Sequence, residues 1–450
     1  MYLEKTLNAV ETNSFIVEIF GLGYVGFPLA VKLSSSGFNV IGIDVNSKRI
    51  ERLKDNVLMD SELSLKEQFL QSRKEKKLLL SESPLESKFS KIGIICVPTP
   101  IPQDDVKSDI FVRKAVENFL EFAKKGDVII LESSIEVGTT DIIQKIIESK
   151  NFTVKEDFGL CFCPERIDPS NKEWGIENIP RVIFCSDDSS FKIAKKIYEN
   201  VNKGNLIRVK DSMSAEVVKS FENAFRLVNI SLVNELAILC DKLGISVKEV
   251  IDAASTKPFG FLPHYPGAGA GGHCIPKDPI FLLESAKKKG VNFETIYNAL
   301  LVNSSMPKYI CDSIEETTSR MNLKKTILVC GLSYKANVED MRDSASFKIM
   351  DELNKRNFKV YGYDPFFNNA LTEKYLIENH LNEKTFITLD NLNDDKIREI
   401  ECMCVVQHHE QTEKRLNQIY EGGQIPFIYD CQNKFQKIKA SKTTLLSLGT

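Results

Sequence analysis

The chain has 450 residues, of which 42% are hydrophobic and 27% charged, a composition that excludes collagen and intrinsically disordered proteins. Its 59 Lys and Arg residues against 62 Asp and Glu give a net charge of -3, so no overall positive field attracts nucleic acid or anionic lipid. The length accommodates about three domains, each large enough to bury its own core.

The cysteines and the N-terminal residues indicate the cellular compartment. The first residues, MYLEKTLNAVETNSF, contain no long apolar core, and no run of about 18 apolar residues occurs in the chain. We therefore expect a cytoplasmic protein with no membrane partner. The 11 Cys residues are odd in number and scattered, which favours reduced thiols over a disulfide framework. Cys161/Cys163 and Cys402/Cys404 are spaced for one face of a strand rather than for zinc, so we expect buried cysteines and no bound metal.

Apolar runs alternate with helix-compatible stretches through the first 200 residues. Strands are expected at 15–20, 39–43, 92–97, 128–131, 160–163 and 182–185, and helices at 28–36, 112–125 and 140–149. This alternation predicts a parallel sheet covered by helices.

The first strand leads into a glycine pattern typical of dinucleotide binding. Gly21, Gly23 and Gly26 form GxGxxG, and Asp44 follows the next strand at the offset expected for a carboxylate that binds the ribose hydroxyls. Glycines let backbone N–H groups and a helix N-terminus approach a pyrophosphate closely. A tight turn with an incidental Asp is the alternative. An ionised Asp44 repels a 2′-phosphate, which favours NAD over NADP, although Lys48 and Arg49 weaken that preference.

The chain changes character after residue 210. Residues 214–242 show apolar side chains at helical spacing and predict one long helix that opens a helical middle domain. A Gly- and Pro-rich loop at 258–279 interrupts this domain, which continues to about residue 305. A second sheet is expected from strands at 325–330, 359–363 and 402–406.

The loop from Pro266 to Pro279 is the most informative segment. Four of its residues are glycines, and Cys274 and Asp278 follow four residues apart. On one helical turn this pair presents a nucleophile and a proton-transferring carboxyl group to one carbon. A lone Cys is more often a small buried residue, but the glycines and Asp278 favour a nucleophile here. For His273, loop shaping or substrate contact is favoured over catalysis as a base.

A polar stripe on the long helix has two interpretations. Glu216, Lys219, Asn223 and Arg226 are spaced three and four residues apart and so share one face. The stripe is either a solvated face or the lining of a cleft, in which a lysine and an amide stabilise an oxyanion. In the second case the apolar residues on the opposite face are buried against the neighbouring domains. Spacing alone does not choose between the two.

Several motifs together resemble the UDP-sugar 6-dehydrogenases. They are GLGYVGFPLA, Val97-Pro98-Thr99-Pro100, Glu132-Ser133-Ser134, Cys163-Pro164-Glu165-Arg166, the Lys219/Asn223 helix, GAGAGGHCIPKDP, Gly331 to Lys335 and Asp340 to Ser344. The resemblance implies an α/β fold with two Rossmann-like doubly wound domains joined by an α-helical connector. The expected domains are 1–210 for NAD, 211–308 for dimerisation and the catalytic loop, and 309–450 for UDP. A homodimer is expected.

The resemblance also implies the chemistry, a four-electron oxidation of a sugar C6 alcohol to a carboxylate with NAD. Cys274 would capture the aldehyde as a thiohemiacetal that is then oxidised to a thioester. Lys219 and Asn223 would stabilise charge on the oxygen. Asp278, Glu165 and Ser134 would hold and activate water.

The remaining binding residues follow from the same motifs. Those expected to contact NAD are Gly21, Gly23, Tyr24, Val25, Gly26, Asp44, Arg49, Thr99, Ser134 and Arg342. Those expected to contact the UDP-sugar are Arg166, Lys219, Asn223, Tyr265, Gly267, Gly269, Gly271, His273 and Lys335. The chain departs from the family at Gln407 to Glu410 and at Gln432, which leaves the contacts at the UDP end open.

The expected substrate is a UDP-N-acetylhexosamine, either UDP-N-acetylglucosamine or UDP-N-acetylmannosamine. His273 before the Cys, Ile275-Pro276 after it, and Arg166 resemble that branch, whereas Lys277 resembles the UDP-glucose branch. Arg166 and His273 would offer polar partners to the acetamido group. The alternatives are a UDP-glucose 6-dehydrogenase, a catalytically silent UDP-sugar binding protein and a two-electron hydroxyacid dehydrogenase. The C2 and C4 configuration of the sugar and the pathway stay open.

Overall fold

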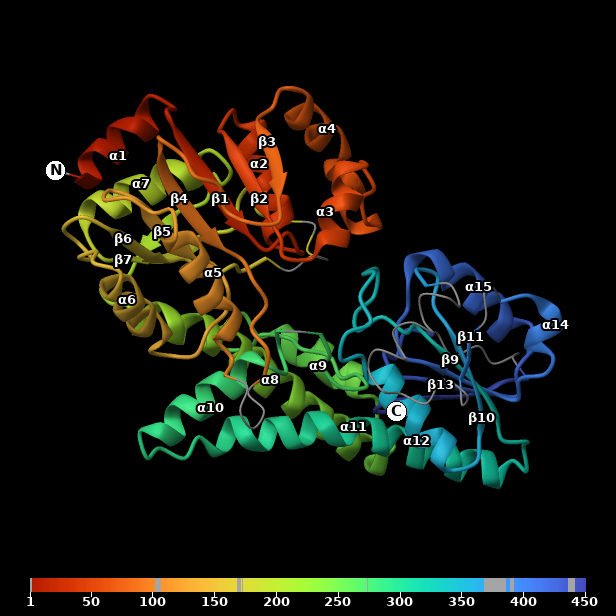
Figure 1. Ribbon diagram of the computed structural model, residues 1–450. Helices are drawn as coiled ribbons and strands as arrows, with labels where there is room; N and C mark the ends of the chain where they lie inside the picture. Colours follow the sequence, from red (N-terminus) through yellow and green to blue (C-terminus); the bar gives the residue numbers. More distant parts are fainter. Residues whose placement is uncertain are drawn as a thin grey trace. The chain divides into compact units, whose positions relative to one another are not determined.

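The computed structural model describes residues 2–101, 107–167, 171, 173–272, 274–367, 386–388, 392–435 and 442–450. It divides into two compact units. Unit 1 comprises Met1–Glu222 and Ile280–Gly290, and unit 2 comprises Asn223–Pro279 and Val291–Thr450. Each unit contains one parallel-dominated sheet with helices on its faces, as the sequence predicts (Figure 1).

The sheet of unit 1 has eight strands in the order β3-β2-β1-β4-β5-β6-β7-β8. The strands are β1 Phe15–Phe20, β2 Val40–Ile43, β3 Leu78–Ser81, β4 Ser90–Ile95, β5 Val128–Leu131, β6 Gly159–Phe162, β7 Arg181–Cys185 and β8 Leu206–Arg208. All neighbours are parallel except β6 and β7, which are antiparallel. The strand order reverses between β1 and β4, and in such sheets ligands bind beyond the carboxyl ends of the strands at this point.

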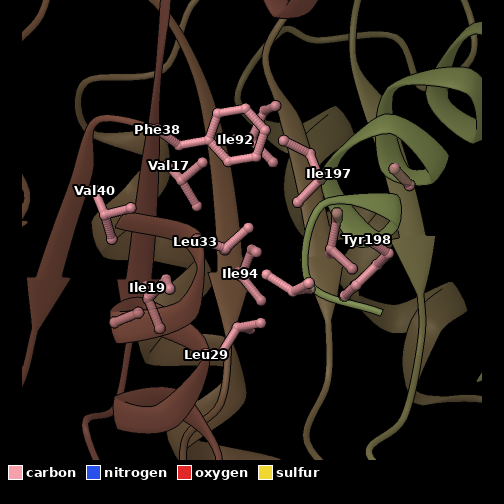
Figure 2. Packing of buried hydrophobic residues seen from close by; sticks show 14 of the residues in the cluster. Val17, Ile19, Leu29, Leu33, Phe38, Val40, Ile92, Ile94, Ile197 and Tyr198 are labelled. Atoms are coloured by element: carbon pink, nitrogen blue, oxygen red, sulfur yellow. The ribbon is translucent and has the colours of Figure 1, made fainter. Parts of the chain in front are cut away.

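Helices cover both faces of this sheet. They are α1 Tyr2–Glu11, α2 Gly26–Ser35, α3 Ser47–Lys54, α4 Lys66–Lys74, α5 Ile110–Leu120, α6 Thr139–Ser149 and α7 Asp188–Glu199, with a short 3-10 helix, η1, at Asp60–Leu65. Figure 2 shows one face of the core, where Ile19 and Ile94 of the strands meet Leu29 and Leu33 of α2. Helices α5 and α6 pack on the opposite face. Strands buried on both faces explain the continuous apolar runs in the sequence.

Unit 2 contains the second sheet and most of the helical middle region. Its helices are α9 Val247–Ser255, α11 Glu294–Arg320, α12 Ala345–Lys355, α14 Asp394–Ile397 and α15 Glu410–Glu421, while α8 Ser212–Leu243 and α10 Asp278–Lys288 belong to both units. The strands are β9 Thr326–Cys330, β10 Lys359–Tyr363, β11 Phe386–Thr388, β12 Cys402–Val405, β13 Phe427–Asp430 and β14 Thr444–Ser447, all parallel, in the order β11-β10-β9-β12-β13-β14. One core cluster joins α8, α9 and α11 to this sheet. The expected boundary after residue 308 lies inside α11.

The cysteines behave as their spacing predicts. All eleven are free thiols, and nine are buried. Cys161 lies in β6 with Cys163 directly after it, and both face the same core cluster, as Cys402 and Cys404 of β12 do in unit 2. Cys274, in contrast, is exposed.

The long helix α8 is present as predicted, but the burial of its apolar side is not. Phe221, Phe225, Leu232 and Leu239 are each 44–62% exposed, so the expectation that this side packs against neighbouring domains is wrong for them within one chain. An 18-residue window of α8 has a mean hydropathy of 1.2, and by length and composition alone this helix, unlike the other described helices, meets the criterion for crossing a membrane. The core helices of soluble proteins meet the same criterion.

Candidate active site

The glycine turn after β1 has the shape of a dinucleotide cradle. Gly21 has a φ of +89°, and a Cβ at Gly26 would lie 1.9 Å from the Gly21 carbonyl oxygen, so both positions require glycine. At Gly23 a Cβ would meet nothing within 4 Å. The loop is therefore closed on the protein side and open where a pyrophosphate would approach the start of α2. Tyr24, 44% exposed, and Val25 lie between Gly23 and α2.

Asp44 is held at the end of β2 by backbone donors. Its Oδ2 accepts from the Leu22 N–H at 2.8 Å, and its Oδ1 from the Asn46 N–H at 2.9 Å. These two bonds leave acceptor sites on both oxygens for ribose hydroxyls. Arg49 donates from Nε to the Leu22 carbonyl at 3.1 Å and forms an ion pair with the buried Glu62. Its charge is thus paired inside the protein, which removes much of the reason to expect NADP.

The other expected residues of unit 1 follow neighbouring strands at the same edge. Thr99 follows β4 and is buried, Ser134 follows β5 and is half-buried, and Glu165 follows β6 with a side chain 12% exposed. The sheet therefore brings them together beyond the carboxyl ends of its strands. Arg166 points its guanidinium at Glu222 of α8, with Nε 3.2 Å from Oε2, and donates to the Pro180 carbonyl at 2.7 Å.

The polar stripe of α8 does not act as one surface. Glu216 is fully buried and caps α6, because its carboxylate accepts from the Gly138 N–H at 2.6 Å and the Thr140 N–H at 2.8 Å. Glu216 is thus a structural residue, which corrects the cleft interpretation for this position. Lys219 and Asn223 are buried one turn apart, and Arg226 is exposed.

Unit 2 joins two of the expected catalytic side chains directly. Asn223 Nδ2 donates to Asp278 Oδ2 at 2.6 Å across 55 residues of sequence. The Asp278 N–H donates to the Cys274 carbonyl at 2.9 Å, so Cys274 lies one helical turn before the start of α10. An exposed thiol and a buried carboxylate therefore lie one helical turn apart, and an amide of α8 binds that carboxylate. His273 lies outside the described residues.

Most glycines of this loop are required by the protein itself. A Cβ at Gly269 would lie 2.9 Å from the Asn303 carbonyl oxygen, and one at Gly271 would lie 2.5 Å from that of Asp343. Asn303 of α11 also holds the loop through both its amide atoms, at 2.6 Å to the Ala270 N–H and 3.0 Å to its carbonyl. Gly267, by contrast, opens on free space. Tight packing against the protein, rather than room for a ligand, explains Gly269 and Gly271.

The second sheet repeats the glycine turn of the first. Gly331 follows β9 with a φ of +85°, and Asp364 follows β10. Asp364 Oδ2 accepts from the Leu332 N–H at 2.7 Å, from the Ser333 N–H and hydroxyl at 2.9 Å each, and from His409 Nε2 at 3.1 Å. Burial disfavours its charge, but the His409 ring and the N–H donors hold the pKa of Asp364 below its ordinary value.

Three further expected binding residues lie in unit 2: Arg342 for NAD, and Lys335 and Tyr265 for the UDP-sugar. Arg342 forms an ion pair with Asp340 at 2.7 Å, and Lys335 is half-buried in the loop after β9. Tyr265 donates its hydroxyl to Asp252 of α9 at 2.7 Å. The two departures from the family pattern lie together, because Gln432 Nε2 donates to Gln407 Oε1 at 2.8 Å.

Comparison with known proteins identifies the family. Residues 16–202, 213–305 and 328–437 match the NAD binding, central and UDP binding domains of the UDP-glucose/GDP-mannose dehydrogenase family. The chain belongs to this family. A UDP-N-acetyl-D-mannosamine dehydrogenase of Methanococcus vannielii is 34% identical over 386 residues, covering 84% of this chain and 86% of that protein. A UDP-N-acetyl-D-glucosamine 6-dehydrogenase of Salmonella typhi is 33% identical, covering 78% and 82%.

Solved structures agree with the sequence comparison. The UDP-D-ManNAc dehydrogenase of Pyrococcus horikoshii superposes with a TM-score of 0.83 at 27% identity, covering 97% of this chain and 99% of that one. As a member of the UDP-glucose/GDP-mannose dehydrogenase family, the chain is an NAD-dependent oxidoreductase. The glycine cradle and Asp44 fit that cofactor. Among the described residues, no cluster of His, Cys, Asp or Glu is arranged to hold a metal ion.

Three buried polar side chains of unit 1 near Glu165 were not assigned a place in the site from the sequence. Arg181 forms ion pairs with Glu165 and Glu132, and the Tyr198 hydroxyl donates to Glu132. All three are almost fully buried. The one sequence signal for this group is the charged residue that begins the apolar strand Arg181-Val182-Ile183. An arginine buried in such a strand needs a charged partner.

Proposed function

We propose that the protein oxidises the C6 primary alcohol of a UDP-N-acetylhexosamine to the carboxylate with two NAD. The observation that carries the proposal is the hydrogen bond from Asn223 to Asp278, which lies one helical turn after the exposed thiol of Cys274. A two-electron dehydrogenase needs no such nucleophile. Relatives named for N-acetylated UDP-sugars at 33–34% identity support the substrate class.

The side chains have complementary roles in this chemistry. Bound NAD accepts the hydride that leaves C6 in each step. Cys274 adds to the aldehyde, and the resulting thiohemiacetal is oxidised to a thioester, while Lys219 and Asn223 stabilise negative charge on the C6 oxygen. Water then cleaves the thioester, with Asp278 and Glu165 as proton acceptors and Ser134 holding the water. One water enters and four electrons leave the sugar, which ends as a carboxylate.

We propose that the binding functions are divided along the chain. Residues 1–210 hold NAD, residues 211–308 carry the catalytic loop and the dimer contact, and residues 309–450 hold the UDP end. The three family segments support this division. The enzyme would act in the cytoplasm as a homodimer and provide a uronic acid for polysaccharide biosynthesis.

The test is the NADH yield from a panel of UDP-sugars. We expect two NADH per UDP-N-acetylglucosamine or UDP-N-acetylmannosamine and a higher kcat/KM for one of them than for UDP-glucose. Cys274→Ser should abolish complete turnover, and Cys311→Ser, at a buried thiol of α11 that donates to the Ile349 carbonyl, is the control. One NADH per sugar would contradict the mechanism, and a preference for UDP-glucose would contradict the substrate.

A further inference from the structure

Strand β7, which runs antiparallel to β6, places a charge at the carboxyl edge of the first sheet. The register pairs Cys161 with Cys185 and Phe162 with Phe184 across β6 and β7. Continued past the end of β6, it brings Arg181, the first residue of β7, opposite Glu165. A strand parallel to β6 would place its last residue at this edge. Because β7 runs in the opposite direction, its first residue lies there instead.

Arg181 is fixed on several sides. Its side chain is 1% exposed, its Nη1 lies 3.0 Å from Glu132 Oε1, and its Nη2 forms an ion pair with Glu165 Oε2. The guanidinium carbon lies 4.7 Å from the centre of the Tyr198 ring, whose hydroxyl donates to Glu132. Burial works against the charge, but the two carboxylates hold the pKa of Arg181 above its ordinary value. The arginine is therefore charged and immobile.

These contacts determine which atom of Glu165 remains available. Oε1 already accepts from the Arg166 N–H at 2.6 Å and the Ile167 N–H at 2.9 Å. Oε2 accepts from Arg181 alone among the described residues. A carboxylate has about four acceptor sites, so the remaining one is on Oε2.

We infer that Arg181 is a positioning residue that fixes the Glu165 carboxylate with Oε2 as its proton-accepting atom, and that Glu132 and Tyr198 hold Arg181 in turn. This rests on the proposed role of Glu165 as a proton acceptor. Loss of Arg181 removes the ion pair on Oε2, so the carboxylate can turn away from the position at which it accepts a proton.

The experiment measures kcat and KM for Arg181→Ala and Arg181→Lys. We expect kcat to fall about 10- to 100-fold in Arg181→Ala and by less in Arg181→Lys, with KM for the UDP-sugar nearly unchanged. Lys91→Met is the matched control, because Lys91 is also 1% exposed and lies 3.4 Å from the buried Glu18 in the same unit. It should lower stability and leave kcat unchanged.

Chemical rescue adds a second readout. Arg181 and Tyr198 line a cavity of about 410 Å³ between α7 and the segment before β8, through which a small cation can reach the vacated position. Guanidinium chloride should return the kcat of Arg181→Ala toward that of the wild type, and neutral urea should not. If Arg181→Ala does not fold, Arg181→Lys alone decides.

Glu165→Gln separates the two possible failures. Undiminished turnover in Glu165→Gln would overturn the proposed role of Glu165 and this inference with it. Lost turnover in Glu165→Gln, together with an undiminished kcat in the Arg181 variants, would overturn the inference alone.

Discussion

Asp44 and Asp364 occupy equivalent places in the two sheets but have different partners. Asp44 accepts two backbone N–H bonds, one on each oxygen, and keeps acceptor capacity on both. Asp364 is 2% exposed, and one of its oxygens accepts four donors of the chain itself. The same turn is thus suited to ribose hydroxyls in unit 1, whereas in unit 2 it serves to hold its own loop.

The first prediction in solution concerns Asp44→Ala. Removal of the carboxylate deletes the acceptor for the ribose hydroxyls and the charge that repels a 2′-phosphate. Loss of a charge-assisted hydrogen bond costs about 1.5–3 kcal/mol, so NAD affinity should fall roughly ten- to hundredfold. Kd values for NAD and NADP, measured by fluorescence titration, check this.

The relative use of the two cofactors decides what Asp44 does. The ratio of kcat/KM with NADP to that with NAD should rise in Asp44→Ala and stay constant in Asp55→Ala, an exposed carboxylate at the end of α3. An unchanged ratio in Asp44→Ala would show that Asp44 does not bind the ribose hydroxyls.

Sequence reasoning grouped residues whose separation a turn or a strand fixes, and it missed groupings that depend on tertiary contacts. GxGxxG with Asp44, and Cys274 with Asp278, are recognisable because a turn or a strand fixes their separation. Arg181 and Glu132 are 49 residues apart and meet only because β7 reverses direction. No local sequence pattern predicts that reversal.

Secondary structure shows the same division between local and tertiary signals. The buried strands β1, β4 and β5 and the long helix α8 carry strong apolar patterns and were predicted within two residues. Helix α1 was not predicted, because only Leu3, Thr6 and Val10 are buried on it, and the three-residue strand β8 has no buried position. Such elements depend on what they pack against, as when Thr6 donates its hydroxyl to the Gly126 carbonyl at 2.7 Å.

The link between α8 and α6 allows a prediction on stability. Glu216 satisfies backbone donors at the start of α6 that have no partner within the helix, and it also accepts the Thr140 hydroxyl at 2.6 Å. Glu216→Ala should lower the free energy of unfolding by about 1–3 kcal/mol, because the buried donors lose their acceptor. Urea unfolding followed by circular dichroism measures this loss.

A control on α6 distinguishes the loss of the cap from the loss of a negative charge. Glu148 is exposed near the end of α6, where its carboxylate accepts from Gln144 at 2.8 Å. Glu148→Ala should leave the urea midpoint nearly unchanged. Equal midpoints for Glu216→Ala and the wild type would show that α6 does not need this cap.

Across the whole molecule, each of the two units contains a sheet with a glycine turn after one of its strands. The long helices make different contacts in each unit. In unit 2, α8 is joined to α11 by the Ser231 hydroxyl, which donates to the Ala299 carbonyl at 2.7 Å, and by Asp241, which accepts from the Tyr309 hydroxyl at 2.7 Å. These contacts bury one side of α8. The other side carries apolar residues that the chain itself leaves uncovered.

That uncovered side leads to the prediction on assembly. Phe225, Leu232, Leu239 and Leu243 are 44%, 62%, 52% and 60% exposed and recur at spacings of seven, seven and four residues, which places them on one face of the helix. A continuous apolar stripe in water marks an interaction site, and a second copy of the chain can bury it by two-fold symmetry. We therefore expect a homodimer whose contact includes α8.

Leu232→Asp combined with Leu239→Asp should shift the protein from dimer to monomer in sedimentation velocity at micromolar concentration, because each substitution buries a charge in an apolar contact. Leu63→Asp is the matched control, since Leu63 is 50% exposed on η1 and is not part of this stripe. A wild-type protein that sediments as a monomer, or a double variant that remains dimeric, would contradict the expectation. Far-ultraviolet circular dichroism of the double variant should match the wild type, because the substituted side chains are more than half exposed in their own chain.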